Sequence, residues 1–317
     1  MKTPKFWSSQ NFISDLLFPL GLLYGLATKL RIKFGKTQKV NIPVICIGNV
    51  TAGGTGKTPV SIAIASLLQK KQKKVFFVSR GYGGKLKNIK VDGTKHSAAE
   101  VGDEPLLLAQ QAPVIVNADR VAGAQKAQQE GAQLILMDDG FQNPGLHKDL
   151  SFLVFDGNSG IGNGRCIPSG PLRETLKDGL KRAQGIIILG EDKQNIAQQV
   201  GNLPVFYGKI TATPLLLDNK NVIAFAGIGK PEKFYKSLQE QGFNIIKTFN
   251  FGDHHQYTRP ELENLLHEAH YFNTELVTTT KDYVKIPTDL QKHFHVLKVD
   301  VCWESSEKLE KFILTNI

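Results

Sequence analysis

The sequence predicts an α/β protein with two domains, and three observations support this fold class. Short apolar runs alternate with helix-like segments over most of the chain, which is typical of a largely parallel sheet covered by helices. One of these runs leads directly into a glycine-rich turn and then into a helix-like segment. The length of 317 residues exceeds the usual size of one hydrophobic core. We therefore expect an N-terminal segment at 1–34, a larger domain at 35–210 and a smaller α/β domain at 211–317.

The N-terminal segment carries leucines and other apolar residues at near-helical spacing between residues 12 and 26. Lysines precede this run at Lys2 and Lys5, and four further cations follow it between 29 and 36. The run is too short to span a bilayer and is interrupted by Pro19 and Gly21. We expect an amphipathic helix that lies in the interface of an anionic membrane. The alternative is a helix that packs on the protein's own core.

The larger domain contains the clearest strand and helix signals. After the strand that begins at Val44, we expect strands at 75–79, 114–117, 134–137, 152–155 and 186–189, and helices at 59–69, 104–111 and 120–130. Residues 205–220 are expected to form a linker. The pattern then restarts with a strand at 222–226 and a tight turn, Gly227-Ile228-Gly229-Lys230-Pro231, that opens a helix through Leu238.

Composition and charge indicate which binding partners and which cellular compartment to expect. Thirty-nine Lys and Arg residues against 29 Asp and Glu give a net charge of +10, which favours anionic partners. No zinc finger, RNA-binding aromatic signature or basic recognition helix is present in the sequence, so we expect no nucleic-acid partner. Cys46, Cys166 and Cys302 are far apart and odd in number, which indicates a reducing compartment. Cys46 lies in an apolar strand and is expected to be a core residue.

The glycine-rich turn predicts a phosphate-binding loop. Successive backbone N–H groups can converge on phosphate oxygens there, while Lys57 reaches the terminal phosphates and the Thr58 hydroxyl suits Mg²⁺. A purely structural turn is the alternative, but it accounts for neither the lysine nor the hydroxyl. The motif departs from G-x-x-x-x-G-K-[ST] at its first position, where Thr51 replaces glycine. The expected phosphate contacts are Thr51, Ala52, Gly53, Gly54, Thr55, Gly56, Lys57 and Thr58.

A second chemical signal is an apolar strand that ends in Asp138 and Asp139. Carboxyl ends of strands form the ligand crevice of open α/β sheets, so one of these acids can hold the Mg²⁺ of a bound nucleotide. Asp103 and Glu104 stand at an expected helix start, where acids are also favourable as caps. His254 follows Asp253 in the smaller domain and can act as a base or occupy a polar loop.

Two arginines stand in glycine- and proline-containing loops, where they suit phosphate or substrate recognition: Arg80 in Ser79-Arg80-Gly81-Tyr82-Gly83 and Arg173 in Pro168-Ser169-Gly170-Pro171-Leu172-Arg173-Glu174. These loops, the phosphate-loop motif and the acidic motifs occur in a fixed order. The series of motifs also includes Asp138-Asp139-Gly140-Phe141-Gln142, Asp253-His254 and Thr279-Thr280-Lys281-Asp282. The ordered series resembles the tetraacyldisaccharide 4'-kinase family, the lipid A kinases of Gram-negative bacteria.

The resemblance implies a P-loop NTPase-like α/β/α sandwich whose second domain closes over ATP and Mg²⁺. It implies transfer of the γ-phosphate to the 4'-hydroxyl of a tetraacylated glucosamine disaccharide 1-phosphate, by a peripheral protein at the cytoplasmic face of the inner membrane. It gives Lys57 to the phosphates, Thr58 and Glu104 to Mg²⁺, and Asp103 to the base position with support from His254. Asp138 and Asp139 match the family's acidic strand end.

One position departs from the family pattern. Asn143 stands where the family usually has histidine, so a role that needs a titrating imidazole is not expected there, although asparagine can still form hydrogen bonds.

Two other functions remain open at the level of sequence. A membrane-associated nucleotide switch is disfavoured because Lys281 is followed by Asp282 and Tyr283 instead of the N-K-x-D guanine-reading pattern, and because Ala52 replaces the signature lysine of partitioning-type ATPases. A kinase of another small substrate shares the same scaffold.

Overall fold

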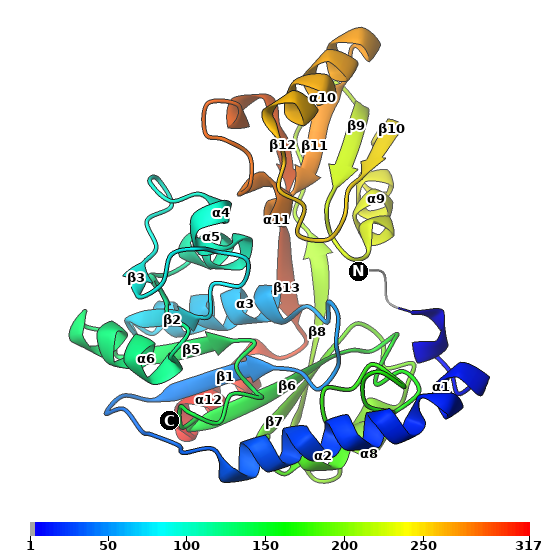
Figure 1. The fold of residues 1–317 in the computed structure, drawn as a ribbon. Helices are drawn as coiled ribbons and strands as arrows, with labels where there is room; N and C mark the ends of the chain where they lie inside the picture. Colours follow the sequence, from blue (N-terminus) through cyan, green and yellow to red (C-terminus); the bar gives the residue numbers. More distant parts are fainter. Residues whose placement is uncertain (1–3) are drawn as a thin grey trace.

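The computed structural model describes residues 4–317, which form two sheets, one largely and one wholly parallel, each covered by helices on both faces (Figure 1). Lys2 lies outside the described residues. The large sheet has nine strands. In spatial order they are β13 (Val299–Trp303), β8 (Val205–Ala212), β7 (Gly185–Leu189), β6 (Leu150–Asp156), β1 (Val44–Gly48), β5 (Leu134–Asp138), β2 (Val75–Ser79), β4 (Val114–Val116) and β3 (Ile89–Lys90). Only the two edge strands, β13 and β3, run antiparallel to their neighbours.

Successive residues of β1 point to opposite faces, and this alternation builds two cores. Ile45 and Ile47 pack in one core with α3, α5 and α12, whereas Val44 and Cys46 pack in the other with α6. Burial on both faces explains why the central strands are continuous apolar runs. The helices of this domain are α3 (Lys57–Lys70), α4 (Ala98–Val101), α5 (Asp103–Ala109), α6 (Arg120–Gln129), α7 (Leu176–Leu180), α8 (Ile196–Gln199) and α12 (Ser306–Thr315).

The smaller domain repeats this design with four parallel strands. Their order is β10 (Asn244–Asn250), β9 (Asn221–Ala226), β11 (Glu275–Thr279) and β12 (His295–Leu297). In β9, Ile223 and Phe225 pack in the core that includes α10 (Arg259–Phe272), while Val222 and Ala224 pack in the core that includes α9 (Pro231–Glu240). The short helix α11 (Thr280–Tyr283) follows β11, and a 3₁₀ turn (Gln291–His293) precedes β12.

The start expected for the smaller domain at 211 lies within two residues of the end of β8, but the expected linker and the expected C-terminal end at 317 differ from the structure. Residues 205–212 of the expected linker form β8 of the large sheet, and the chain returns to that sheet as β13. Leu309 and Ile313 of α12 then pack in the core beside α3. Strand β13 has few buried side chains, so it lacks the apolar run by which the other strands are recognised. The chain therefore crosses between domains twice, and Thr213 N donates to Lys298 O (3.0 Å) where the crossings meet.

The N-terminal segment forms a 3₁₀ turn (Lys5–Trp7) and two helices, α1 (Phe12–Leu16) and α2 (Phe18–Phe34). Gly21 and Gly25 face the body of the protein, where an added Cβ would lie 2.8 Å from Cys166 O and 3.1 Å from Cys166 Sγ, respectively. The large apolar side chains point away from it. Exposed side chains on this segment are Phe12, Ile13, Leu16, Phe18, Leu20, Leu22, Leu23, Tyr24, Leu26, Leu30 and Phe34.

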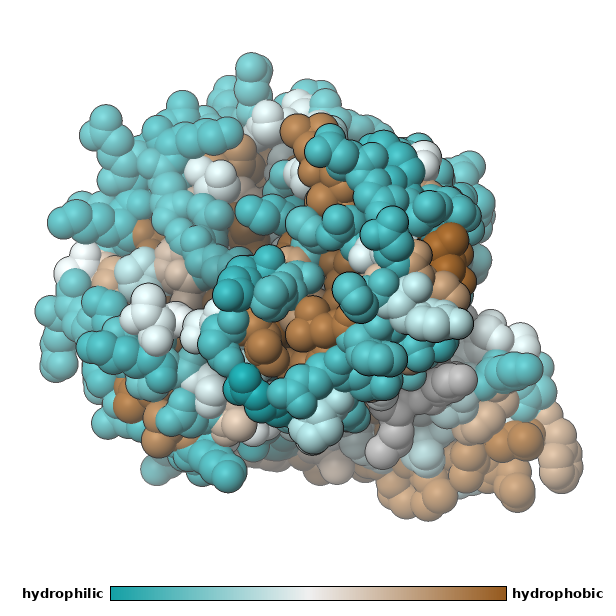
Figure 2. Space-filling view, turned by 90° about the horizontal axis from the view of Figure 1, so that it is seen from above, coloured by the Kyte–Doolittle hydropathy of each residue, from teal (hydrophilic) through white to brown (hydrophobic). Residues whose placement is uncertain are grey.

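The helix packs on the protein through small residues, and its outer face carries large apolar side chains beside the exposed cations Lys29, Arg31 and Lys33. The expected binding to a membrane interface stays a prediction. Figure 2 shows apolar side chains gathered over this part of the molecule, at the lower right of the view. No helix within residues 4–317 is long and apolar enough to cross a membrane. The segment is therefore an apolar ridge attached along one side of the large domain, as Figure 1 shows.

Candidate functional site

The loop between β1 and α3 has the backbone of a phosphate-binding loop. Gly53 and Gly56 adopt positive φ angles of 109° and 86°, and a Cβ at Gly56 would lie 2.5 Å from Leu189 Cδ1. A Cβ at Gly53 or Gly54 would meet no heavy atom within 4 Å, so this part of the loop is open to a ligand. Helix α3 begins at Lys57 and directs its N-terminal N–H groups to the same place. The loop thus fits the phosphates of a nucleotide.

Thr51, the departure from the glycine pattern, is part of the loop's internal hydrogen bonding. Its side chain is buried, and Asn49 Nδ2 donates to Thr51 Oγ1 (3.3 Å) and to Thr55 Oγ1 (3.1 Å). Ala52 N donates to Pro171 O (2.7 Å), which ties the loop to the segment that carries Arg173. A side chain at this position therefore supports the loop without filling the open part around Gly53.

Asp138 lies at the carboxyl end of β5 and faces the start of α3. Its Oδ2 accepts a hydrogen bond from Thr58 Oγ1 (2.8 Å), and its Oδ1 accepts one from Ser61 Oγ (3.0 Å). Burial, followed by the nearby Glu104 carboxylate, raises the pKa of Asp138 to about 7. Burial also raises the pKa of Glu104. Two desolvated carboxylates beside a hydroxyl are hard oxygen ligands that a divalent cation would stabilise, so these residues fit Mg²⁺.

Within residues 4–317, no three His, Cys, Asp or Glu side chains gather closely enough to hold a metal ion by themselves. Mg²⁺ in nucleotide sites usually takes only one or two protein carboxylates and completes its shell with phosphates and water. The expected set of Thr58, Glu104, Asp138 and Asp139 therefore stays a prediction as a ligand set.

Asp139 organises the cations of the phosphate loop. Its carboxylate accepts two hydrogen bonds from Arg173 Nη1 (2.8 and 3.1 Å), and Lys57 Nζ lies 3.6 Å from its Oδ1. Burial alone would raise the pKa of Asp139, but Lys57 and Arg173 outweigh burial and hold the pKa below its ordinary value. Lys57 and Arg173 are thus brought together at the phosphate-binding loop.

The expected base pair comes from both domains. Asp103 begins α5 of the large domain, and His254 lies in the loop between β10 and α10, where its φ is 61°. His254 Nδ1 lies 2.9 Å from Asp103 Oδ2. The hydrogen bond with Asp103 is the main cause that raises the pKa of His254. The Asp103 carboxylate is buried, yet this contact and Lys281 hold its pKa below the ordinary value despite desolvation.

Lys281 is a further residue of this cluster that sequence reasoning did not place in the site. Its Nζ donates to His254 Nε2 (3.2 Å) and lies 3.9 Å from Asp103 Oδ2. In the neutral imidazole this bond makes Nε2 the acceptor, so Nδ1 carries the proton and donates to Asp103. The signal in the sequence was the Thr279-Thr280-Lys281-Asp282 motif at the end of a strand.

Arg80 and Arg120 form a second cationic position at the carboxyl ends of β2 and β4. Arg80 is exposed, whereas Arg120 is buried and donates through Nη1 to Asn117 O (2.7 Å). Within the described residues, Arg120 Nε has no hydrogen-bond partner. Burial, followed by the charge of Arg80, lowers the pKa of Arg120 to about 10. An orphaned buried donor beside a second arginine favours an anionic ligand. Sequence reasoning missed Arg120, although it opens the helix after a strand end.

Asn143 has a role in the turn after the two acids. Its Oδ1 accepts hydrogen bonds from Gly145 N (3.0 Å) and Leu146 N (3.3 Å). The neighbouring Gln142 Nε2 donates to Asn49 O (2.8 Å) and so connects this turn to the phosphate loop. The side chain at 143 thus serves local structure by hydrogen bonding alone.

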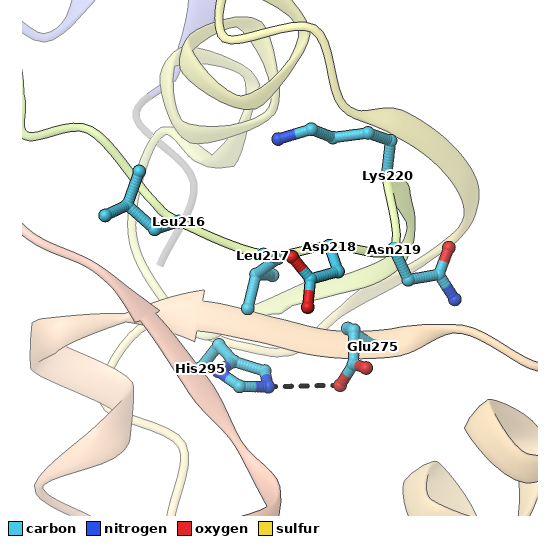
Figure 3. Close-up of a pocket in the computed structure, with 7 residues that line it drawn as sticks. All are labelled: Leu216, Leu217, Asp218, Asn219, Lys220, Glu275 and His295. Atoms are coloured by element: carbon cyan, nitrogen blue, oxygen red, sulfur yellow. Dashed lines mark hydrogen bonds and ion pairs between the residues drawn. The ribbon is translucent and has the colours of Figure 1, made fainter.

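A separate cavity of about 500 Å³ lies at the amino ends of the strands of the smaller sheet (Figure 3). Glu275 and His295 begin the neighbouring strands β11 and β12, and their side chains lie 3.0 Å apart in the lining of this cavity. Ligands of open α/β sheets bind at the carboxyl ends of strands, where the motif residues lie. The cavity at the amino ends is therefore not the candidate active site.

Comparisons with known proteins identify the family of this chain. The family model of tetraacyldisaccharide-1-P 4'-kinase matches residues 13–317. Tetraacyldisaccharide 4'-kinase of Rhodospirillum centenum is 44% identical over 323 residues, with 99% of this chain and 96% of the relative covered. The corresponding protein of Paramagnetospirillum magneticum is 43% identical over 314 residues, with 98% and 97% covered.

A solved structure shows the same fold. The crystal structure of LpxK from Aquifex aeolicus in complex with ATP is 30% identical and aligns with a TM-score of 0.75, covering 96% of this chain and 99% of that one. The expected P-loop α/β sandwich with a second α/β domain is confirmed. The chain belongs to the tetraacyldisaccharide-1-phosphate 4'-kinase family.

Proposed function

We propose that this chain transfers the γ-phosphate of ATP to the 4'-hydroxyl of a tetraacylated glucosamine disaccharide 1-phosphate, a step of lipid A biosynthesis. The observation that carries the proposal is the Asp103–His254 pair, which joins the large domain to the smaller one. Phosphoryl transfer to an alcohol needs charge neutralisation, alignment and a group that accepts the hydroxyl proton. The crevice supplies all three in one place.

The nucleotide side of the reaction belongs to the loop at 51–58 and the acids behind it. ATP with Mg²⁺ supplies the transferable phosphoryl group and neutralises part of its charge. Thr58 and Asp138, supported by Glu104 and Asp139, would hold the metal ion. Lys57 directs its ammonium group to the terminal phosphates, and Asp139 keeps that lysine and Arg173 in place.

The resemblance gives the base position to Asp103 with support from His254; in this proposal the roles are exchanged, so that His254 accepts the proton of the acceptor hydroxyl and Asp103 positions the ring. The bond from Nδ1 to Asp103 leaves Nε2 as the ring's acceptor atom. The acceptor hydroxyl would replace Lys281 Nζ at Nε2, which frees the ammonium group for the phosphate oxygens. Asp103 also stabilises the imidazolium that forms, because a buried carboxylate lies beside the new charge.

The 1-phosphate of the acceptor lies at Arg80 and Arg120 in this proposal. Arg80 follows β2 and Arg120 comes after β4, and these strands lie two and three positions from β1 in the sheet. Both arginines are therefore away from the phosphate loop but at the same carboxyl ends of the strands. Such a separation suits an elongated disaccharide that carries its phosphate on the sugar that does not react.

Arg80→Ala is therefore expected to raise KM for the disaccharide 1-phosphate about tenfold and to leave KM for ATP unchanged, because one charge-assisted hydrogen bond is lost. The measurement compares this substrate with the same disaccharide lacking the 1-phosphate, for which Arg80→Ala should change little. Lys87→Ala, an exposed cation in the following loop, is the matched control. Equal losses with both acceptors would contradict the assignment of Arg80 to the 1-phosphate.

The apolar ridge at residues 12–34 brings the enzyme to its lipid in this proposal. Large apolar side chains cover its outer face, and the exposed cations Arg31, Lys33 and Lys36 follow them. An apolar helix face with flanking cations binds the interface of an anionic membrane by burial and by charge. We place the protein on the cytoplasmic surface of the inner membrane, where ATP is present.

Replacing Leu16, Leu23 and Leu26 together by serine is expected to weaken binding to anionic phospholipid vesicles at least about tenfold, because burial of each leucine stabilises the bound state. All three side chains are at least half exposed, so the fold should be kept. Flotation with vesicles measures the effect. Leu216→Ser is the control, since Leu216 is 89% exposed and lies in the linker. If the triple variant floats with vesicles as well as the wild-type protein does, the ridge is not the membrane-binding surface.

The decisive test of the overall proposal is a phosphate-transfer assay with labelled ATP. It offers the disaccharide 1-phosphate in mixed micelles beside water-soluble sugars. Selective transfer to the lipid is the expected result. Transfer to a soluble sugar would favour a kinase of another substrate, and hydrolysis without transfer would favour a nucleotide switch.

A further inference from the structure

A second bridge joins the two domains on the other side of the phosphate loop. Asp156 ends β6 of the large sheet and is only 5% exposed. Its Oδ2 lies 3.0 Å from Lys233 Nζ and 3.4 Å from Lys230 Nζ. Both lysines belong to the smaller domain, where Lys230 precedes α9 and Lys233 lies in its first turn. A buried carboxylate of one domain thus holds two cations of the other.

The two bridges flank the strand that enters the phosphate loop. In the sheet order β6 lies beside β1 on one side, while β5, β2 and β4 lie on the other. Asp103, on α5, packs with the β4 side of the sheet and reaches His254. The Asp156 bridge therefore holds the smaller domain on the β6 side. One bridge alone would leave the domain free to rock about it, whereas two fix how it sits over the loop.

The Asp156 carboxylate is also held in place by a hydrogen bond within its own domain. Its Oδ1 accepts a hydrogen bond from Asn158 N (3.0 Å), which holds the carboxylate in place at the strand end. Burial tends to raise the pKa of Asp156, but Lys233 and Lys230 outweigh it and keep the pKa below the ordinary value. A desolvated carboxylate is unfavourable without a cation, and these two lysines are its ion-pair partners. The lysines themselves are half exposed, so parting the domains rehydrates them readily.

The two chain crossings that connect the domains form a hinge, and the ion pairs of Asp156 would restrain rotation of the smaller domain about it. The chain crosses between them at 213–220 and again at Lys298, so both crossings lie at one hinge beside the β8–β13 pair. Asp103 and His254 are in contact in this arrangement of the domains, and a rotation of the smaller domain about that hinge would separate them. We propose that Asp156, Lys230 and Lys233 form an electrostatic latch that sets the fraction of closed protein. They are positioning residues, which act on the reaction by placing His254 over the phosphate loop.

The closure part of this inference is independent of substrate, and only its kinetic part rests on the proposed function. Pulsed electron paramagnetic resonance can measure closure on the full chain, with spin labels on Gln125→Cys in α6 and Asn264→Cys in α10. Both positions are exposed. The background carries Cys302→Ser, since Cys302 is exposed while Cys46 and Cys166 are buried.

The double variant Lys230→Gln/Lys233→Gln is expected to shift the label distances toward longer values, because it opens the latch without touching the core. Asp156→Asn should do the same, since it keeps an acceptor for Asn158 N and loses the charge. Lys236→Gln is the matched control: Lys236 lies on the same helix but pairs with Glu240 of that helix (3.6 Å). Reversal of the whole latch, Asp156→Lys with Lys230→Asp and Lys233→Asp, should restore the shorter distances.

Kinetics should follow the closed fraction. The lysine double variant is expected to lose about tenfold in kcat/KM for the lipid acceptor, and the reversed latch should recover most of this loss. Raising the salt concentration from 0.05 to 0.5 M should open the wild-type protein and leave the double variant unchanged, because screening weakens an ion pair only where one exists.

Unchanged distances in the lysine double variant would overturn the latch. Longer distances with unaltered kcat/KM would also overturn it, because closure would then not limit the reaction. If the wild-type protein fails to phosphorylate the lipid at all, the proposed function is wrong, and the distance measurements still decide whether the latch exists.

Discussion

Replacing Lys57 by alanine is expected to lower kcat for phosphate transfer by about 10²–10³-fold. The lysine ammonium group is held at the start of α3 by Asp139, and in the proposed function it contacts the terminal phosphates, where negative charge is redistributed in the transition state. Loss of one such preorganised contact has this magnitude in other enzymes. Single-turnover measurements with saturating ATP separate this effect from weaker nucleotide binding.

Lys70→Ala is the matched control, because Lys70 is an exposed lysine in the last turn of the same helix. It should retain full turnover. Thermal unfolding of both variants checks that the fold is kept. A folded Lys57→Ala protein with near-normal kcat would refute the assignment of the loop to phosphate binding.

Replacing His254 by alanine is expected to lower kcat by about 10²–10⁴-fold, the range for a general base, with little change in ATP affinity. Asp103→Ala should cause a loss of similar kind, because Asp103 holds the ring and raises its pKa. The double variant should be little worse than the more damaging single variant, since residues that act as a unit lose their effects non-additively. His267→Ala, on the exposed side of α10, is the control.

The pH dependence gives this pair a separate test. A base must be unprotonated, so kcat should rise with pH through the pKa of His254, which Asp103 raises above its ordinary value. Asp103→Asn removes the negative charge, so the acidic limb of the profile should move to lower pH even as the maximal rate falls. An acidic limb that stays in place in Asp103→Asn would show that another group accepts the proton.

Most of the phosphate-binding half of the site is predictable from local sequence. A buried strand, glycines at fixed intervals, and a lysine and hydroxyl at the helix start all act within one short segment. Positive φ at Gly53 and Gly56 is a requirement of that segment itself. The same holds for the acids at the end of β5, since parallel strands place their carboxyl ends together.

Other features depend on contacts between distant residues. The Asp103–His254 pair joins positions 151 residues apart, and only the resemblance to a family suggested it before the structure. Arg120 is unusual only because the fold buries it beside Arg80 and leaves its Nε without a partner among the described residues. No local sequence pattern predicts these contacts, because hydrophobic periodicity indicates which face of an element is apolar but not which distant residue packs against it.

The sequence by itself determined the α/β class, the phosphate loop and the acids that serve it, because each follows from backbone geometry and hydrophobic periodicity within a few residues. Only the tertiary structure decided that β13 and α12 return to the large sheet, that Asp156 meets two lysines of the other domain, and that the leucines of α2 face outward. The last outcome shows the reason plainly. Gly21 and Gly25 fit closely against Cys166, and this steric match, made with a residue far along the chain, determines which face of the helix is buried.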